Sequence, residues 1–248
     1  MDLQNSVDVL GVGISRTDKN RVREKIKGAL LADRTLTIFT PNPEIIMLAQ
    51  KDKKFKEVLN GADLLLADGI GVVIASKLLC DPLPERVTGI DTGEFILSLA
   101  SELSLPVFLL GAKEGVGERA AKEIKARYPH IRIVGVHHGY FEKSGMENEA
   151  VIQQINASGA RILFVCFGAP MQEIWISENK SRLKSVKLYT GLGGALDVWA
   201  KDVRRAPKLL QSIGLEWLWR ILKEPRRAAF LLKMPAFLCK VLCRKISK

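Results

Sequence analysis

The sequence predicts a Rossmann-like α/β domain with a mostly parallel sheet, helices on both faces, and a helical C-terminal appendage. Short apolar runs alternate with amphipathic segments of helical length over the first 200 residues, a pattern typical of strands buried on both faces. Apolar residues make up 47% of the 248 residues, enough for a large core. The excess positive charge lies in the last fifth of the chain, which places a boundary near residue 200.

Seven apolar runs are expected to form strands joined by right-handed crossover helices. They cover residues 7–14, 35–42, 62–69, 106–112, 131–139, 161–169 and 186–194. Asn42 is placed to cap the helix after the second run, with Pro43 at its first position, and Pro170 is expected to begin another helix in the same way. In the tripeptide Asp-Thr-Gly, Asp91 is expected to cap the helix that follows.

Ligands of open α/β sheets bind beyond the carboxyl ends of the strands, so the residues just after each run are candidates for a site. These residues are Thr40, Asn42, Asp68, Gly111, Gly139, Tyr140, Gly168, Gln172 and the segment from Gly191 to Asp197. Asp68 differs from the others because three leucines lead almost directly to its carboxylate. The glycines beside it, Gly69 and Gly71, would allow a tight turn or the close approach of a ligand.

Neither a cofactor nor a metal is expected. The glycines at 69 and 71 lack the third glycine of a dinucleotide-binding fingerprint, which disfavours a nicotinamide-dependent oxidoreductase. The glycines at 111, 115 and 117 match neither that fingerprint nor a P-loop, so Gly111 is either a phosphate contact or an ordinary turn residue. No Asp-x-Asp is present to hold a divalent metal on a nucleotide diphosphate. Arginine and backbone N–H groups would then balance a diphosphate, and Arg86 is a candidate unless it is simply a surface arginine.

The C-terminal segment, residues 201–248, differs in charge from the predicted core, residues 1–200. It holds 13 Lys and Arg against 3 Asp and Glu, a net charge of +10 that leaves +1 of the total +11 for the core. Such an asymmetry indicates an anionic partner. Apolar residues recur at helical spacing over residues 207–224, and Pro225 is expected to begin a second helix.

The second C-terminal helix is predicted to anchor the protein at an anionic membrane surface. Four cations would share one of its faces: Arg226, Lys233, Lys240 and Arg244. The apolar residues around them are Phe230, Leu231, Leu232, Phe237, Leu238, Val241 and Leu242. Because lysines interrupt any apolar run of about 18 residues, this helix would lie in the interface and not span the bilayer.

A nucleic acid is not an expected partner of this basic segment. Its Trp and Phe residues lie in apolar helices instead of alternating with basic residues in a solvated groove, and a nucleic acid would not explain Asp68. No basic stretch followed by an apolar stretch occurs near Met1, so no signal peptide is expected. The protein is therefore predicted to be cytoplasmic, and peripheral on the inner face of the cell membrane.

Several motifs occur together and in order between about residues 7 and 227. They read TPNPEIIMLA, ADLLLADGIGVV, ERVTGID, HHGYF, FVCFGAPMQEIWI and LGGALDVWA, followed by RAP, GLEWLWR and EPRR. This set resembles the TagA/WecG/CpsF glycosyltransferase family. The resemblance implies metal-independent transfer of N-acetylmannosamine from UDP-N-acetylmannosamine to the 4-hydroxyl of N-acetylglucosamine on undecaprenyl diphosphate, in synthesis of the wall teichoic acid linkage unit. Transfer of N-acetylmannosaminuronic acid is the alternative, and a homodimer of the core is left open.

The resemblance also implies roles for residues at the strand ends. Asp68 would be the catalytic base of an inverting transfer, which needs one base beside the acceptor hydroxyl and charge stabilisation for the departing UDP on the other side. The competing interpretation is that Asp68 only caps the next helix. Thr40 and Asn42 would help to place the sugars, and Arg86 and Gln172 would contact the donor or the leaving diphosphate.

Further implied roles concern the uridine and the diphosphates. Tyr140 and Asp197 are the positions expected to hold the uridine. Arg220 and Arg227 are expected to face the diphosphates from an appendage that closes over the active site. The sequence departs from the family pattern at Met171, where relatives often have a basic residue before the Gln-Glu pair.

Overall fold

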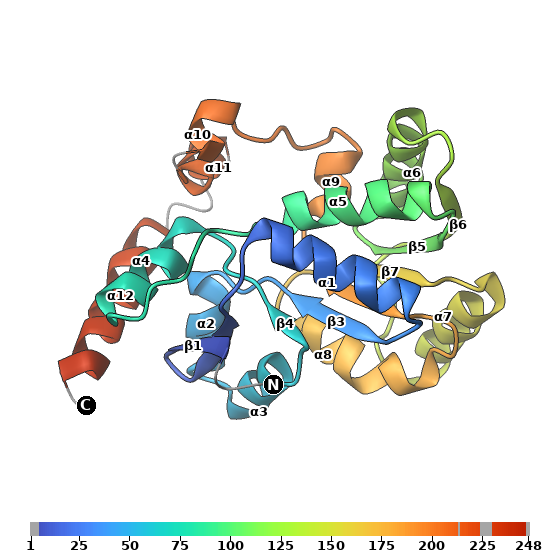
Figure 1. The fold of residues 1–248 in the computed structure, drawn as a ribbon. Coiled ribbons are helices and arrows are strands. Elements are labelled where there is room, and N and C mark those ends of the chain that lie inside the picture. Colours follow the sequence, from blue (N-terminus) through green and yellow to red (C-terminus); the bar gives the residue numbers. More distant parts are fainter. Residues whose placement is uncertain (1–4, 213, 224–229, 247–248) are drawn as a thin grey trace.

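The computed structural model describes residues 5–212, 214–223 and 230–246 (Figure 1). Its centre is a six-stranded sheet in which every neighbouring pair of strands is parallel. The strands lie in the order β4 (Leu64–Leu65), β3 (Leu36–Phe39), β8 (Leu188–Gly191), β7 (Ile162–Cys166), β5 (Pro106–Gly111) and β6 (Arg132–His137). The predicted parallel α/β architecture is therefore confirmed.

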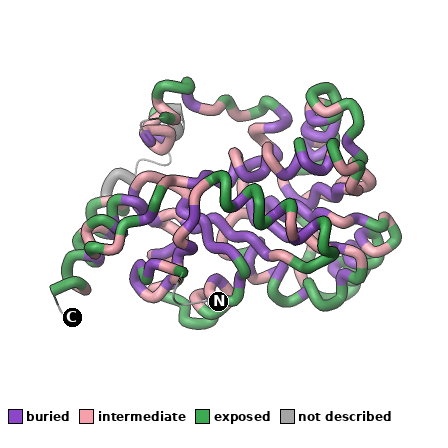
Figure 2. The backbone as a smooth tube through the Cα atoms, viewed as in Figure 1, coloured by how far each residue is buried: buried purple, intermediate pink, exposed green. Residues whose placement is uncertain are grey.

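Helices cover both faces of the sheet, and alternate strand residues point towards them. One face packs against α1 (Lys19–Leu31), α5 (Gly89–Glu102), α6 (Val116–Arg127) and α9 (Ala195–Trp199). The other packs against α2 (Pro43–Ala49), α3 (Lys53–Asn60), α7 (Gly145–Ser158) and α8 (Met171–Asn179). In β7, Phe164 belongs to the first core and its neighbour Val165 to the second, so the strand is buried on both sides (Figure 2).

Residues 7–14 do not form a strand of the main sheet, so that prediction is wrong. They belong to the antiparallel hairpin of β1 (Ser6–Val9) and β2 (Val12–Ser15), which packs into the same core as α2 and α3. Leu10 and Gly11 at the turn have positive φ values of 55° and 82°, as the favoured two-residue hairpin turn requires. An apolar run of eight residues does not distinguish one strand from two short ones. The glycine at its centre was the available signal.

The helix after β3 begins as predicted. Asn42 is the N-cap residue of α2, its Oδ1 accepts a hydrogen bond from the Ile45 amide at 3.0 Å, and Pro43 is the first helical residue. At α8 the prediction is one residue off, because Pro170 is the N-cap and Met171 begins the helix.

The predicted cap of α5 is wrong. The helix begins at Gly89 and its N-cap is Thr88, whose Oγ1 accepts a hydrogen bond from the Asp91 amide at 3.2 Å. The helix thus starts earlier than the Asp-Thr-Gly tripeptide indicated, and Asp91 lies in its first turn. A carboxylate in that position interacts favourably with the positive end of the helix dipole.

Over its described residues, 201–212, 214–223 and 230–246, the C-terminal segment forms three helices: α10 (Lys208–Ser212), α11 (Glu216–Lys223) and α12 (Phe230–Ile246). The single helix predicted over residues 207–224 is interrupted at Gly214, which has a φ of 78°. In Figure 1, α10 and α11 stand away from the sheet, while α12 packs on α2 and α4 (Ile70–Leu78). No helix in the described part of the chain has the length and apolar character needed to cross a bilayer.

Helix α12 packs on the core with its apolar face. Phe237 and Val241 are completely buried, and Met234 and Leu238 pack against the same core while partly exposed. Phe237 and Val241 therefore do not form a membrane-inserted surface, and that part of the prediction is wrong. The physical reason is that α2 and α4 offer these side chains a protein surface on which to bury.

Gly71 permits this close packing. A Cβ atom at position 71 would lie 2.6 Å from Met234 Sδ and 2.7 Å from Pro43 Cγ. The missing side chain therefore makes room for α12 and α2 and not for a ligand. Gly69, in contrast, has a φ of 102°, so it serves the tight turn that the sequence indicated.

We expect Gly71→Ala to destabilise the protein and Gly28→Ala to stabilise it. In α1, a Cβ atom at Gly28 meets nothing within 4 Å, so alanine should raise the free energy of unfolding by about 0.5–1 kcal/mol through its helix propensity. At Gly71, crowding against Met234 and Pro43 should outweigh that gain and lower the free energy of unfolding by about 1–3 kcal/mol. Urea unfolding followed by circular dichroism measures both values. Equal stabilisation by the two substitutions would contradict this packing of α12.

Candidate functional site

Three pockets lie next to one another along the carboxyl ends of the strands. The Asp68 pocket, with a volume of about 110 Å³, and the central pocket, of about 330 Å³, share Asn42 and Asp68 as lining residues. The central pocket and the Tyr140 pocket, of about 350 Å³, share Gly168 and Gly193. We call this row of three adjoining pockets the groove; it lies at the edge of the sheet where open α/β proteins bind ligands.

Asp68 lies where the first two pockets meet. Backbone hydrogen bonds continue the pairing of β3 and β4 up to this residue, because the Leu66 amide donates to the Phe39 carbonyl at 2.9 Å and the Asp68 amide to the Pro41 carbonyl at 3.2 Å. The chain then turns at Gly69, which is the N-cap of α4. Asp68 is therefore not the N-cap of the next helix, which argues against the interpretation that it only caps that helix.

Thr40 and Asn42 follow β3 and line the central pocket together with Asp68. Thr40 is buried, and a Cβ atom at Gly89 would lie 2.9 Å from Thr40 Oγ1, so the start of α5 packs directly on this hydroxyl. Asn42 is held by its capping bond to α2. The ends of two neighbouring strands, β3 and β4, therefore bring these three predicted residues together.

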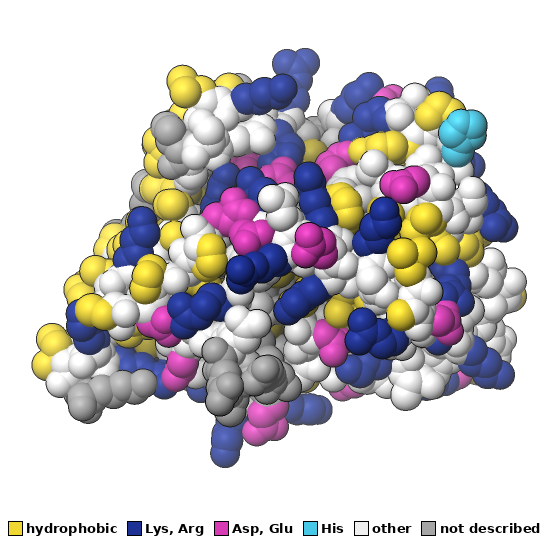
Figure 3. All heavy atoms as spheres, viewed as in Figure 1, with side chains coloured by type: hydrophobic (Ala, Val, Ile, Leu, Met, Phe, Trp, Pro, Cys, Tyr) yellow, Lys and Arg dark blue, Asp and Glu magenta, His cyan; other side chains and the backbone are white. Residues whose placement is uncertain are grey.

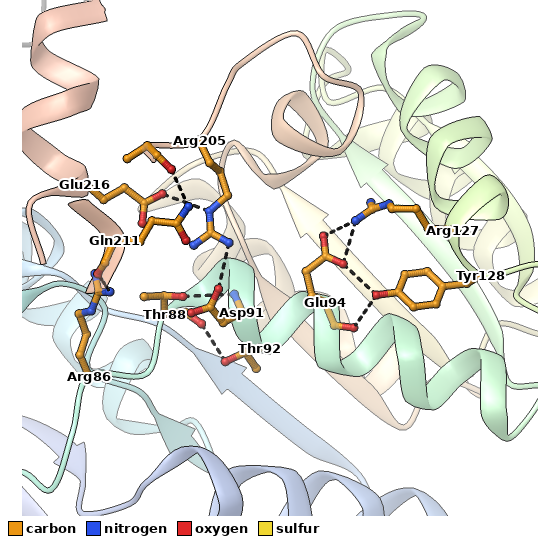
Figure 4. A network of polar contacts seen from close by, with 11 residues as sticks. Arg86, Thr88, Asp91, Thr92, Glu94, Arg127, Tyr128, Arg205, Gln211 and Glu216 are labelled. Atoms are coloured by element: carbon orange, nitrogen blue, oxygen red, sulfur yellow. Dashed lines mark hydrogen bonds and ion pairs between the residues drawn. The ribbon is translucent and has the colours of Figure 1, made fainter. Parts of the chain in front are cut away.

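Arg86 lies beside Asp68 on the loop between α4 and α5. The Val87 amide donates to the Ala67 carbonyl at 3.1 Å, which draws this loop along the end of β4. Arg86 is half-buried, lines the Asp68 pocket, and donates a hydrogen bond through Nη2 to the Gln211 carbonyl of α10 (Figure 4). It is thus a pocket residue and not an isolated surface arginine.

Arg205 joins the core to the C-terminal helices. Its Nη1 lies 2.9 Å from Asp91 Oδ1 in α5, and its Nε lies 3.3 Å from Glu216 Oε1 in α11 (Figure 4). Burial raises the pKa of Asp91, but a hydrogen bond with Thr88 and the charge of Arg205 together bring it below its ordinary value. Arg205 and Glu216 also line the Asp68 pocket. No spacing rule singled out Arg205, although the Arg-Ala-Pro motif contains it.

The C-terminal segment forms one wall of the Asp68 pocket. Its lining residues there include Gly214, Glu216, Trp217 and Met234. A Cβ atom at Gly214 would lie 2.8 Å from Ile70 Cβ, so the turn between α10 and α11 rests directly on the first residue of α4. The pocket around Asp68 is therefore built jointly by the sheet edge and by residues beyond position 200.

Gln172 holds two loops together between the central pocket and the Tyr140 pocket. It is buried near the start of α8, and its Oε1 accepts hydrogen bonds from the amides of Gly168 at 3.2 Å and Gly193 at 2.8 Å. Gly168 follows β7 and Gly193 follows β8, so one side chain fixes the spacing of two strand ends. Gln172 also lines the central pocket.

The Tyr140 pocket combines aromatic and charged side chains. Tyr140 is 71% exposed, and Asp197 is half-buried in the first turn of α9. Lys143 Nζ lies 3.8 Å from the centroid of the Phe141 ring and donates to the Gly139 carbonyl at 2.7 Å. Burial lowers the pKa of Lys143. An exposed ring can stack on a nucleobase, and the neighbouring polar groups can bind its edge.

Gly111 lines none of these three pockets. It ends β5 with a φ of 138°, and a Cβ atom there would lie 2.4 Å from the Cys166 carbonyl oxygen of the neighbouring strand. Glycine is therefore required by the pairing of β5 with β7. Its neighbours Ala112 and Lys113 line the Tyr140 pocket, so a ligand contact from this turn would come from them.

The described residues form no metal site. Over residues 5–212, 214–223 and 230–246, no three His, Cys, Asp or Glu side chains gather closely enough to hold a metal ion. The positively charged groups that line the Asp68 pocket are Arg86 and Arg205. Three further arginines with predicted roles cannot be placed, because Arg226, Arg227 and the side chain of Arg220 lie outside the described residues.

The other cations of the predicted basic stripe lie on α12. Lys233 forms an ion pair with Glu44 of α2, and Arg244 Nη2 lies 2.7 Å from Asp8 Oδ2 of β1. Lys240 is exposed. Two of these three cations therefore contact carboxylates of the core, and the third faces solvent.

Comparisons with known proteins agree with the motifs. The chain matches the model of the glycosyl transferase WecG/TagA/CpsF family over residues 7–248. It is 37% identical over 246 residues to the N-acetylglucosaminyldiphosphoundecaprenol N-acetyl-beta-D-mannosaminyltransferase of Staphylococcus aureus strain MRSA252, covering 98% of this chain and 95% of the relative. The protein of the same name from strain MW2 is 36% identical over the same shares. The chain therefore belongs to the WecG/TagA/CpsF family of glycosyl transferases.

Proposed function

We propose that this protein transfers N-acetylmannosamine from UDP-N-acetylmannosamine to the 4-hydroxyl of N-acetylglucosamine on undecaprenyl diphosphate, in synthesis of the wall teichoic acid linkage unit. The position of Asp68 carries the proposal. Among the described residues it is the one carboxylate that lines both the Asp68 pocket and the central pocket. The chain that places it there aligns over 98% of its length with relatives named as mannosaminyltransferases.

The groove suggests an order for the two substrates. The uridine occupies the Tyr140 pocket, where Tyr140 and Asp197 contact it. The diphosphate passes the loops joined by Gln172, and the N-acetylmannosamine reaches the central pocket near Thr40. The N-acetylglucosamine of the acceptor enters the Asp68 pocket from the side of the C-terminal helices. Asp68, which lines both pockets, then lies between the acceptor hydroxyl and the donor sugar.

The reaction needs one base and one source of positive charge. The acceptor oxygen attacks C1 of the donor sugar, the bond from C1 to the UDP oxygen breaks, and UDP leaves with that electron pair. Asp68 takes the proton of the attacking hydroxyl, since carboxylates are ordinarily ionised at neutral pH. Attack opposite the leaving group inverts C1, so a second carboxylate acting as nucleophile is unnecessary. Arg86 and nearby helix N-termini balance the charge on the departing diphosphate.

The lipid-linked acceptor requires the groove to lie close to a membrane surface. Large apolar side chains are exposed on the C-terminal helices at Leu209, Leu222, Leu242 and Ile246. They belong to α10, α11 and α12, on the side of the molecule where apolar side chains gather in Figure 3. Lys240 of α12 is also exposed. This surface suits shallow, peripheral contact with the anionic inner face of the cell membrane.

The activity itself is tested with the purified protein and a short-chain lipid-linked N-acetylglucosamine. UDP release from UDP-N-acetylmannosamine is expected, and much slower release from the corresponding uronic acid donor. Asp68→Asn should abolish transfer because the amide cannot accept the proton, while calorimetry should give a dissociation constant for UDP within about threefold of the wild type. Substantial turnover by Asp68→Asn would exclude this base. A preference for the uronic acid would replace the proposed donor by the alternative.

Arg86→Ala should lower kcat by roughly 30- to 1000-fold, because about 2–4 kcal/mol of stabilisation of the developing charge is lost. Arg86→Lys keeps the charge without the planar guanidinium, so part of the rate should return. Excess EDTA should leave wild-type turnover unchanged, since arginine and N–H groups act where other transferases use a metal. Turnover that stops with EDTA and returns with magnesium or manganese would remove this role from Arg86.

Lys240→Glu should weaken sedimentation with anionic liposomes about five- to thirtyfold, since each charge near an anionic leaflet contributes about 1 kcal/mol and a reversal changes the charge by two. Turnover on a soluble acceptor analogue should be kept, because Lys240 lines none of the three pockets. Lys122→Glu, at an exposed position of α6, is the matched control and should bind liposomes like the wild type. Equal losses in both variants would indicate a general charge effect and no binding surface on α12.

A further inference from the structure

Glu173 is a buried acid that the proposed mechanism does not use. It is 1% exposed in the first turn of α8 and lines none of the three pockets. Its Oε2 has no hydrogen-bond partner among the described residues. Burial raises the pKa of Glu173 to about 6, although a hydrogen bond from Gln172 opposes the shift. A buried carboxyl group that is incompletely hydrogen-bonded costs stability, so its presence needs a reason other than stability.

The hydrogen bonds of Gln172 supply that reason. Its Oε1 accepts from the amides of Gly168 and Gly193, which determines that the NH2 group of the same amide points the other way. There Nε2 donates to Glu173 Oε1 at 2.8 Å. If the Gln172 amide turned over, its NH2 group would face two backbone N–H donors and its oxygen would face a carboxylate. Glu173 therefore selects the one orientation in which both loops are hydrogen-bonded.

Close packing holds the side chain of Gln172 in the same place. A Cβ atom at Gly191 would lie 2.9 Å from Gln172 Nε2 and 3.0 Å from its Cδ, so the amide group lies against the end of β8 where glycine leaves room for it. The two glycines that bond to its oxygen line both the central pocket and the Tyr140 pocket. A change in the Gln172 amide would therefore move loops that line both of these pockets.

We propose that Glu173 is a positioning residue for the donor, which acts by orienting the Gln172 amide and does not touch the substrate. The groups it positions lie where the diphosphate of a nucleotide sugar would pass from the Tyr140 pocket to the central pocket. Removing the hydrogen-bond acceptor at position 173 loosens the Gly168 and Gly193 loops. This weakens binding of the nucleotide sugar more than binding of the lipid-linked N-acetylglucosamine. The inference rests on the proposed path of the donor along the groove.

The test compares Glu173→Leu, which removes the hydrogen-bond acceptor of the Gln172 NH2 group, with Glu173→Gln, which keeps a side-chain oxygen that can accept this bond. Glu173→Leu should raise the KM for the nucleotide sugar and the dissociation constant for UDP about tenfold. This is the effect expected when one buried hydrogen-bond donor, the Gln172 NH2 group, loses its partner. The KM for the lipid acceptor should stay within about twofold. In Glu173→Gln, the KM for the nucleotide sugar and the dissociation constant for UDP should both lie within about threefold of the wild-type values.

A double substitution separates positioning from a purely structural role. In a Gln172→Ala background, Glu173→Leu should change the dissociation constant for UDP less than twofold, because the residue through which it acts is gone. The same tenfold loss in that background, an equal rise in the KM for the acceptor, or wild-type UDP binding by Glu173→Leu would each overturn the proposal. If Glu173→Leu does not fold, Glu173→Met serves as the variant without an acceptor.

UDP binding also separates this inference from the proposed reaction. Wild-type protein that binds UDP but does not transfer N-acetylmannosamine would refute the proposed reaction, and the UDP dissociation constants of the variants would still decide the role of Glu173. Wild-type protein that transfers the sugar while Glu173→Leu binds UDP normally would refute only the role of Glu173. Wild-type protein that does not bind UDP would overturn both.

Discussion

The packing of the C-terminal segment on the turn after β4 is the contact on which the groove depends. Two glycines determine how closely it can approach, because a Cβ atom would lie 2.6 Å from Met234 Sδ at Gly71 and 2.8 Å from Ile70 Cβ at Gly214. These contacts involve the residues that directly follow Asp68 in the chain. Asp68 and one wall of its pocket are therefore positioned by the same packing, and residues beyond position 200 line that pocket.

Two polar links lie along the groove, one at the Asp68 pocket and one between the central and Tyr140 pockets, and their pH dependences have opposite signs. A hydrogen bond with Thr88 and the charge of Arg205 outweigh burial and keep the pKa of Asp91 low, so this link stabilises the fold above the ordinary pKa of an aspartate and is lost as the pH falls through the lowered value. Glu173 has a pKa raised from 4.5 to about 6, so the fold loses stability as the pH rises through that interval. Near neutral pH the first link is favourable, while the second costs stability and keeps Gln172 oriented. Functional sites commonly contain such costs.

The spacing of apolar residues was sufficient to predict most of the fold, and the errors occurred where spacing is ambiguous. The run ILFVCFGA became β7 and its loop because a strand buried on both faces needs nothing but apolar residues. Residues 7–14 have the same character, yet Gly11 turns them into a hairpin. At α5, Thr88 is the N-cap and Asp91 lies in the first turn, and the first helical residue, Gly89, packs against Thr40.

By itself, the sequence determined that a carboxylate follows a buried strand and that the motifs have the order of a known family, because both depend on residues that are close in the chain. The tertiary structure decided what the apolar face of α12 packs against, why position 71 is glycine, and that Arg205 pairs with Asp91, 114 positions away. Periodicity shows that a helix face is apolar. It does not show whether protein or lipid buries that face, because both surfaces favour the same side chains.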